Sequence, residues 1–295
     1  MKILVTGSNG FIGANIKEFF ENKCNVFAPK RESLNLLNFV HVENYLKTNF
    51  FDVVIHCGVT LTSVDENVKM YSNFEKCSKL FGKMVCIGSG AEFDKRHYIP
   101  KMKEDYFGKY VPEKSDIYGY SKYLIAKDII EKNKNIYNLR VFGIFGKYED
   151  YRRRLISNNI CRKLIGTNIS INKNTYFDYM YIKDFCKILE IFIKKNPREN
   201  TYNVSTGKVI DFLSLAKIIN NIEHNGLEIQ IKKSGLNPEY SANNRKFLNE
   251  FGIHEFIDYK ASIEELFYWY KNESGLIFND KIFDTWKKSN LGAKS

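Results

Sequence analysis

A glycine-rich turn between a short apolar strand and an amphipathic helix is the feature that most constrains this fold. Lys2–Thr6 is a β-branched and apolar run, as expected of a buried parallel strand. Glycines follow at positions 7, 10 and 13, one residue wider than the usual Gly-x-Gly-x-x-Gly, and a helical pattern then includes Ile16 and Phe20. Such a turn presents free N–H groups at a helix N-terminus to a pyrophosphate. The predicted dinucleotide contacts are Gly7, Ser8, Asn9, Gly10, Phe11, Ile12 and Gly13.

The residues after the second predicted strand indicate which dinucleotide binds. Asn25–Ala28 reads as that strand, and NAD-selective folds carry an acidic residue near its end for the ribose 2′-hydroxyl. Here Lys30 and Arg31 follow, and two cations suit a 2′-phosphate, which favours NADPH. The alternative is a pair of solvated charges on a loop. Asn35 is predicted to lie near the adenine.

Strands alternate with helices along the first half of the chain, which indicates a parallel α/β sheet. The predicted strands are Phe51–His56, Met84–Ile87 and Tyr137–Phe142, and the predicted helices are Asp65–Phe81 and Tyr118–Lys132. The pattern loosens after Gly146. There we expect helices at Leu155–Leu164, Phe212–Asn220 and Ser262–Tyr270, and strands at Asp178–Ile182 and Thr201–Val204.

Three side chains are candidates for chemistry on a carbonyl or alcohol oxygen. Tyr118 and Lys122 lie four residues apart, so a helix would place both on one face. An ammonium beside a phenol favours the phenolate, which makes the tyrosine a usable general acid or base. Ser89 follows the strand Met84–Ile87, at the sheet edge where parallel folds bind ligands. The alternative is an aromatic residue on a surface helix.

Composition excludes several other classes of protein. The net charge is +11, yet the lysines are spread along the chain and no basic block exceeds Arg152–Arg154, so nucleic-acid binding is not favoured. The six cysteines form no Cys-x-x-Cys pair and no histidine cluster accompanies them, so we expect neither a disulfide framework nor a metal site. No apolar run is long enough for a membrane span or a signal peptide, and we therefore expect a cytoplasmic protein.

Several motifs in order resemble the extended short-chain dehydrogenase/reductase family, specifically its sugar-nucleotide branch, the NAD-dependent epimerase/dehydratase family. The likeness covers nearly the whole chain. The motifs are Thr6-Gly7-x-x-Gly10-Phe-Ile-Gly13, Asp52-Val-Val-Ile-His-Cys, Ser89 four residues before Phe93, Tyr118-x-x-x-Lys122, Arg140-x-x-x-x-Phe145-Gly146, Phe177-Asp-Tyr-Met-Tyr-Ile-Lys-Asp184 and Asn203-Val-Ser-Thr-Gly207.

The resemblance implies a Rossmann-like doubly wound parallel sheet with a smaller α/β C-terminal substrate domain. Residues 1–146 and 178–206 would bind NADP, and residues 147–177 and 207–295 would bind a sugar nucleotide. Tyr118 would exchange the proton at the sugar's C4 oxygen, Ser89 would hydrogen-bond that oxygen, and Lys122 would bind the nicotinamide ribose. The resemblance also implies a homodimer through the helices Asp65–Phe81 and Tyr118–Lys132, and further cofactor contacts from Cys57, Gly58, Val59 and Val141.

Departures from the family pattern narrow the expected reaction. Sugar-nucleotide 4,6-dehydratases carry Asp-Glu directly after the catalytic Ser/Thr, where this chain has Gly90 and Ala91. The bifunctional GDP-fucose synthases place an epimerising cysteine two residues after the serine, again at Ala91, and their partner histidine aligns near Arg154. Phe177 stands where the family has an arginine that binds the pyrophosphate. Arg162 or the Arg152–Arg154 cluster would take over that role. The alternative is that these arginines form a solvated face. The predicted substrate contacts are Ser89, Ala91, Glu92, Arg154 and Arg162.

The nearest pattern is that of the 4-keto-6-deoxy-sugar reductases. We therefore expect an NADPH-dependent C4 reductase of a nucleoside-diphosphate-linked 4-keto-6-deoxy sugar, with a GDP-linked hexose or heptose favoured and without C3 or C5 epimerisation. Such an enzyme would serve surface polysaccharide biosynthesis. Two alternatives are a C4 epimerase that retains NAD and a non-catalytic dinucleotide-binding module. Lys30 and Arg31 argue against the epimerase, and the intact Ser89, Tyr118 and Lys122 argue against the module.

Overall fold

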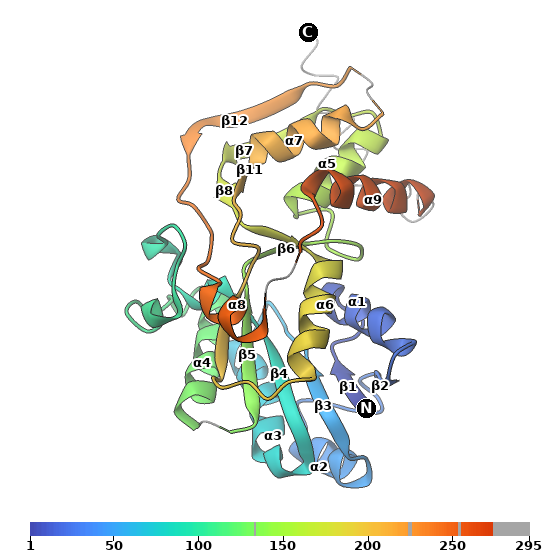
Figure 1. The fold of residues 1–295 in the computed structure, drawn as a ribbon, viewed down its shortest axis with the longest axis vertical. Helices are drawn as coiled ribbons and strands as arrows, with labels where there is room; N and C mark the ends of the chain where they lie inside the picture. Colours follow the sequence, from blue (N-terminus) through green and yellow to red (C-terminus); the bar gives the residue numbers. More distant parts are fainter. Residues whose placement is uncertain (133, 224–225, 253–254, 274–295) are drawn as a thin grey trace.

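A parallel sheet of six strands forms the centre of the fold (Figure 1). The computed structural model describes residues 1–132, 134–223, 226–252 and 255–273. The strand order is β10-β5-β4-β3-β1-β2, and every pairing within this sheet is parallel. The strands are β1 (Lys2–Thr6), β2 (Asn25–Phe27), β3 (Phe51–His56), β4 (Phe81–Ser89), β5 (Ile136–Val141) and β10 (Thr201–Val204). The strand order reverses between β1 and β3, which confirms the predicted doubly wound α/β class.

Helices cover both faces of the sheet because each strand alternates apolar side chains between them. Ile3 and Val5 of β1 pack in one apolar cluster with α1 and α6, whereas Leu4 packs in the other with α2, α3 and α4. Figure 1 shows α1 and α6 on one side of the sheet. These helices are α1 (Phe11–Glu21), α2 (Phe39–Thr48), α3 (Val64–Lys76), α4 (Ile117–Lys132) and α6 (Ile182–Ile193). Short 3-10 turns lie at Ser78–Leu80, Gly90–Glu92, Lys95–His97 and Glu104–Tyr106.

A second group of elements lies beyond the carboxyl edge of the sheet, at the top of Figure 1. It includes α5 (Leu155–Leu164), α7 (Phe212–Asn221), α9 (Tyr259–Asn272), and the parallel pair β7 (Ile169–Asn174) and β12 (Ile229–Leu236). The remaining elements are β6 (Gly143–Phe145), β8 (Tyr176–Phe177), β9 (Tyr179–Tyr181), β11 (Ile210–Asp211) and α8 (Arg245–Phe251). The division into an NADP-binding domain and a sugar-nucleotide-binding domain stays a prediction. Residues 274–295 of the second predicted domain lie outside the part of the chain that the structure describes.

Two predicted elements differ from the observed ones in their bounds. The helix expected over Asp65–Phe81 ends at Lys76, because Phe81 is buried as the first residue of β4. The strand expected over Asp178–Ile182 covers only Tyr179–Tyr181, and Ile182 instead begins α6, which sequence patterning did not predict. Leu266, Phe267 and Tyr270 of α9 are buried, as their predicted apolar stripe requires.

An ion pair without solvent contact joins three elements at the carboxyl edge of the sheet. Arg140 on β5 donates through Nε to a carboxylate oxygen of Glu92 at 2.7 Å, and both side chains are fully buried. The guanidinium also donates to Asn203 of β10 at 3.0 Å and lies over the rings of Phe93 and Phe107. Removing one partner of such a pair leaves the other charge buried and uncompensated.

We therefore predict that Arg140→Met destabilises the protein by about 3–5 kcal/mol, because the Glu92 carboxylate loses its counter-charge. The free energy of unfolding, from urea titration, measures the loss. Lys194→Met is the control, since it breaks an exposed pair with Glu190 and should cost less than about 1 kcal/mol. Equal losses for the two variants would contradict the prediction.

Candidate active site

The glycine-rich turn brings backbone to backbone at the carboxyl end of β1. Gly7 has a φ of +65°, and a Cβ there would lie 2.7 Å from the carbonyl carbon of Cys57. A Cβ on Gly13 would collide with the Gly7 carbonyl. Gly10 caps α1 without a side-chain hydrogen bond, and the first turn holds no acidic residue. The first N–H groups of α1 are therefore available to an anion, and the turn fits a dinucleotide pyrophosphate.

A cavity of about 940 Å³ opens beside this turn and brings together most of the predicted site. Its wall combines the turn, the ends of β4 and β5, the start of α4 and residues from the second group of elements. The predicted site residues that line it are Gly7, Gly10, Phe11, Ile12, Gly13, Cys57, Val59, Ser89, Ala91, Tyr118, Val141 and Arg154. Residues proposed from separate motifs thus face one space.

A second cavity of about 320 Å³ continues from the first, since Gly7 and Val59 line both. It collects the other cofactor residues predicted from sequence, namely Ser8, Asn9, Lys30, Arg31 and Asn35. Lys30 and Arg31 are exposed, and neither forms an ion pair within the part of the chain that the structure describes. One carboxylate, Glu66, also lines this space. Two cations and one carboxylate at this second cavity give a net positive charge, which suits an anionic group of a ligand.

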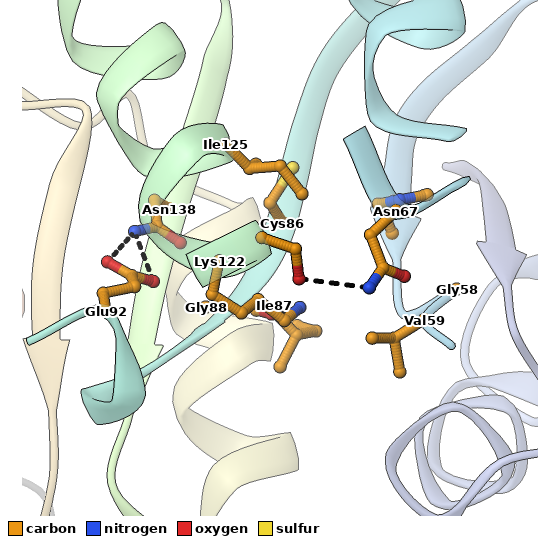
Figure 2. A pocket seen from close by; sticks show the side chains of 12 residues that line it. Gly58, Val59, Asn67, Cys86, Ile87, Gly88, Glu92, Lys122, Ile125 and Asn138 are labelled. Atoms are coloured by element: carbon orange, nitrogen blue, oxygen red, sulfur yellow. Dashed lines mark hydrogen bonds between the residues drawn. The ribbon is translucent and has the colours of Figure 1, made fainter. Parts of the chain in front are cut away.

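Lys122 lies behind Tyr118 on α4, almost fully buried. Its Nζ donates to the Ile87 carbonyl at 2.6 Å and lies 5.8 Å from the centre of the Tyr118 ring. Figure 2 shows Lys122 at a small enclosed cavity of about 10 Å³, which Gly58 and Asn67 also line. His56 lines it too, and burial together with the Lys122 charge lowers the pKa of His56 to about 3. Lys122 is thus held next to a neutral imidazole, and its ammonium group has further N–H donors for a ligand.

Ser89 ends β4 and caps the 3-10 turn Gly90–Glu92. Its Oγ accepts the Ala91 N–H at 3.1 Å, and its N–H donates to the Glu92 carboxylate at 3.0 Å. Asn138 donates to both oxygens of that carboxylate at 3.0 Å, as Figure 2 shows. This network fixes the backbone that carries the Ser89 hydroxyl.

Two predicted substrate contacts are placed elsewhere. The Glu92 side chain is fully buried in the network with Arg140, because a buried carboxylate needs a counter-charge. Glu92 therefore lies beneath Ser89 and outside the lining of the large cavity. Arg162 is half-buried on α5, where its Nε donates to Asn158 at 2.9 Å, and it too lies outside that lining. Arg154 and Phe177 do line the cavity.

Sequence reasoning missed Glu149 and Tyr240, which also line the large cavity. Glu149 is buried and accepts a hydrogen bond from Ser157, and burial raises the pKa of Glu149 to about 8. Tyr240 is half-buried among aromatic rings, and its hydroxyl lies where a side chain at position 90 would stand. Each residue reaches the cavity only through the fold, so no local sequence motif marks either of them.

In the described ranges, no helix combines the length and apolar character needed to cross a membrane. The same residues contain no group of three or more His, Cys, Asp or Glu side chains that could hold a metal ion.

Residues 3–205 match the sequence profile of the NAD dependent epimerase/dehydratase family. The chain belongs to this family. The match includes the glycine-rich turn, Ser89, Tyr118 and Lys122, and it confirms the resemblance drawn from the motifs. The chain is therefore a Rossmann-type member of a family of nicotinamide-dependent enzymes.

Individual relatives are distant. An ADP-L-glycero-D-manno-heptose-6-epimerase from Brachyspira hyodysenteriae is 20% identical over 75% of this chain and 80% of its own length. A GDP-L-colitose synthase from Yersinia pseudotuberculosis is 21% identical over 92% of this chain and 99% of its own length.

Solved structures share the fold over nearly the full chain. A GDP-L-fucose synthetase from Naegleria fowleri superposes with a TM-score of 0.79 at 16% identity, covering 93% of each chain. A GDP-mannoheptose C4 reductase from Campylobacter jejuni, solved with NADP, has a TM-score of 0.77 at 18% identity, covering 92% of this chain and 98% of its own. Similar structures also include a UDP-glucose 4-epimerase and a dTDP-glucose 4,6-dehydratase.

The second cavity generates a prediction on cofactor choice. Lys30→Ala together with Arg31→Ala should weaken NADPH binding by roughly tenfold or more and leave NADH binding nearly unchanged, because charge-assisted contacts to the 2′-phosphate supply ~1–3 kcal/mol each. Titration of each dinucleotide by fluorescence measures both affinities. A wild-type protein that binds NADPH and NADH equally would contradict the assignment.

The Tyr118 geometry generates a second prediction. Tyr118→Phe removes the acid but keeps the ring, so dinucleotide binding should survive while turnover falls by roughly 10²–10⁴-fold. Tyr120→Phe is the matched control, since Tyr120 lies on the same helix but outside the lining of the large cavity. Steady-state kinetics of the two variants provides the comparison. Near-normal turnover in Tyr118→Phe would refute the active-site assignment.

Proposed function

We propose that this protein is an NADPH-dependent C4 reductase of a nucleoside-diphosphate-linked 4-keto-6-deoxy sugar. A GDP-linked hexose or heptose is favoured as substrate, and surface polysaccharide biosynthesis as the pathway class. The observation that carries the proposal is one cavity wall that holds Ser89 and Tyr118, with Lys122 behind them and the glycine-rich turn alongside. A cytoplasmic homodimer stays a prediction.

The residues divide the work of carbonyl reduction between them. When bound, the dihydronicotinamide supplies the hydride that reduces the carbonyl carbon. Ser89 hydrogen-bonds the carbonyl oxygen, where negative charge develops. Tyr118 transfers its phenolic proton to that oxygen, and Lys122 stabilises the phenolate that remains until solvent returns the proton. The cofactor would be held by the glycine-rich turn, with Lys30 and Arg31 at the 2′-phosphate.

The positions at which bifunctional relatives carry their acid/base pair hold no such pair here. Gly90 and Ala91 follow Ser89 and carry no ionisable group, and Arg154 stands where a histidine was expected in bifunctional relatives. Cys57 also lines the cavity, but burial raises the pKa of its thiol to about 12, so it is a poor base. Proton abstraction from C3 or C5 therefore lacks a suitable base among these residues.

Several similar proteins act on GDP-linked sugars, which supports the choice of substrate class. They include the GDP-L-fucose synthetase, the GDP-mannoheptose C4 reductase and the GDP-L-colitose synthase. Epimerases and dehydratases are also among the similar proteins, so the residues around Ser89 carry the choice of reaction. The alternative function is a C4 epimerase that retains NAD.

We predict that purified protein oxidises NADPH when a GDP-linked 4-keto-6-deoxy sugar is supplied, and that the product formed in deuterated water carries no enzyme-dependent deuterium at C3 or C5. Absorbance at the NADPH band measures the first outcome, and mass spectrometry with NMR measures the second. Protein that arrives with tightly bound NAD and interconverts C4 epimers without net NADPH oxidation would instead establish the alternative.

A further inference from the structure

Six aromatic side chains in the lining of the large cavity touch one another in an unbroken series. The Tyr240 ring is the link between them. Its centre lies 5.0 Å from the ring centres of Phe142 and Tyr98, and 4.9 Å from that of Phe177. Phe177 extends the series to Phe212 at 5.0 Å and to Tyr179 at 5.2 Å. The aromatic cluster consists of Tyr98, Phe142, Phe177, Tyr179, Phe212 and Tyr240.

The aromatic cluster is open to the cavity rather than covered by other side chains. Five of its six members are half-buried, and Phe142 is buried. Rings that fill a core are covered on all sides, whereas rings that line a binding cavity keep part of their surface free for a ligand. The Tyr98 hydroxyl donates to the Gly90 carbonyl at 3.4 Å, and the Tyr240 hydroxyl also lies at Gly90. Near Ser89 the cluster therefore offers ring carbon rather than free hydroxyl groups.

The cluster begins beside the residue proposed to contact the reacting carbonyl oxygen. Gly90 follows Ser89 directly, and a Cβ built on Gly90 would lie 2.4 Å from the Tyr240 hydroxyl and 2.8 Å from the Phe142 ring. A sugar whose C4 oxygen reaches Ser89 therefore brings the atoms next to C4 toward these rings. In a 4-keto-6-deoxy sugar those atoms are C3 and C5, and C5 carries the C6 methyl group.

The cluster also stands where a charge is expected. Phe177 occupies the position at which the family pattern has an arginine that binds the pyrophosphate. A phenyl ring cannot pair with a phosphate, but its negative π face attracts C–H groups. The charged residues of the cavity lining are Lys95, Glu149 and Arg154, and none of them belongs to the cluster. The cluster therefore suits an apolar part of the ligand.

We propose that the aromatic cluster determines substrate specificity at C6: it packs against the C–H face of the sugar and its C6 methyl group, and it disfavours sugars with a hydroxyl or a charge at C6. This inference rests on the proposed function, which places the C4 carbonyl at Ser89. A methyl group against these rings is stabilised because both lose contact with water. A hydroxyl in the same place loses its hydrogen bonds to water without a replacement.

The first experiment compares sugars that differ only at C6. GDP-6-deoxymannose should bind the protein in the presence of NADPH roughly tenfold more tightly than GDP-mannose, because only GDP-mannose buries an unpaired hydroxyl. The pair dTDP-6-deoxyglucose and dTDP-glucose makes the same comparison with another nucleotide. Isothermal titration calorimetry measures the dissociation constants, and NADPH cannot reduce these C4 alcohols, so binding is read without turnover. A ratio near one in both pairs, a preference for the hydroxyl, or no binding of any of the four would overturn the proposal.

The second experiment asks whether the cluster sets this affinity ratio. Phe177→Ala removes the ring that contacts three others, so the affinities for the 6-deoxy sugar and its 6-hydroxy counterpart should become nearly equal. The affinity for the free nucleoside diphosphate should stay unchanged. Phe212→Ala, which removes another half-buried ring of the cluster, should shift the ratio in the same direction. Phe39→Ala is the matched control and should keep the wild-type ratio, since Phe39 lies on α2, outside the cavity lining.

The outcomes separate this proposal from the proposed function. A general loss of structure would weaken both sugars equally, so an unchanged ratio in both cluster variants would overturn the role of the cluster. Equal weakening of the free nucleoside diphosphate and both sugars by Phe177→Ala would show that the cluster holds the nucleotide, which would also overturn it. A wild-type protein that fails to oxidise NADPH with 4-keto sugar nucleotides would overturn the reductase assignment, while the affinity ratio would still decide the specificity at C6.

Discussion

The buried carboxylate of Glu92 is the constraint on which the active site depends. It accepts hydrogen bonds from the Ser89 backbone, from Asn138 and from Arg140, so the turn after β4 is tied to β5. Arg140 in turn reaches Asn203 on β10, and the link spans three strands of the sheet. An ion pair this deep is expensive to desolvate, and it persists only where its geometry is well satisfied. Here the satisfied ion pair fixes the backbone position of Ser89, the proposed contact to the carbonyl oxygen.

The topology of the sheet explains why the predicted cofactor and substrate residues meet. All six strands are parallel, so their carboxyl ends share one edge, and the strand order reverses between β1 and β3. The glycine-rich turn follows β1, Ser89 ends β4, and Val141 ends β5. Each side chain therefore reaches the cavity without a special loop. The second group of elements then covers this edge and contributes residues such as Arg154 and Tyr240.

The parts of the site that sequence predicted are those encoded over a few residues. The glycine-rich turn is defined by the spacing of its glycines, and Tyr118 with Lys122 by one helical turn, so the sequence alone predicts both. Glu92, predicted as a substrate contact, lies outside the cavity lining, because its position three residues after Ser89 gives no sign that its carboxylate turns inward to Arg140. Tyr240 was missed because no local pattern links it to this cavity, and only the packing of distant segments brings it beside Gly90.

The residues that follow Ser89 bear on which reaction this wall can support. Carbonyl reduction needs one proton, delivered to an oxygen, whereas dehydration and epimerisation also need a base that removes a proton from carbon. Gly90 and Ala91, which follow Ser89, carry no group that could remove such a proton. With a glycine and an alanine at positions 90 and 91, elimination lacks the acidic pair that dehydratases carry there, whereas the proposed protonation of the oxygen keeps its donor in Tyr118. In physical terms, these two positions favour reduction over elimination.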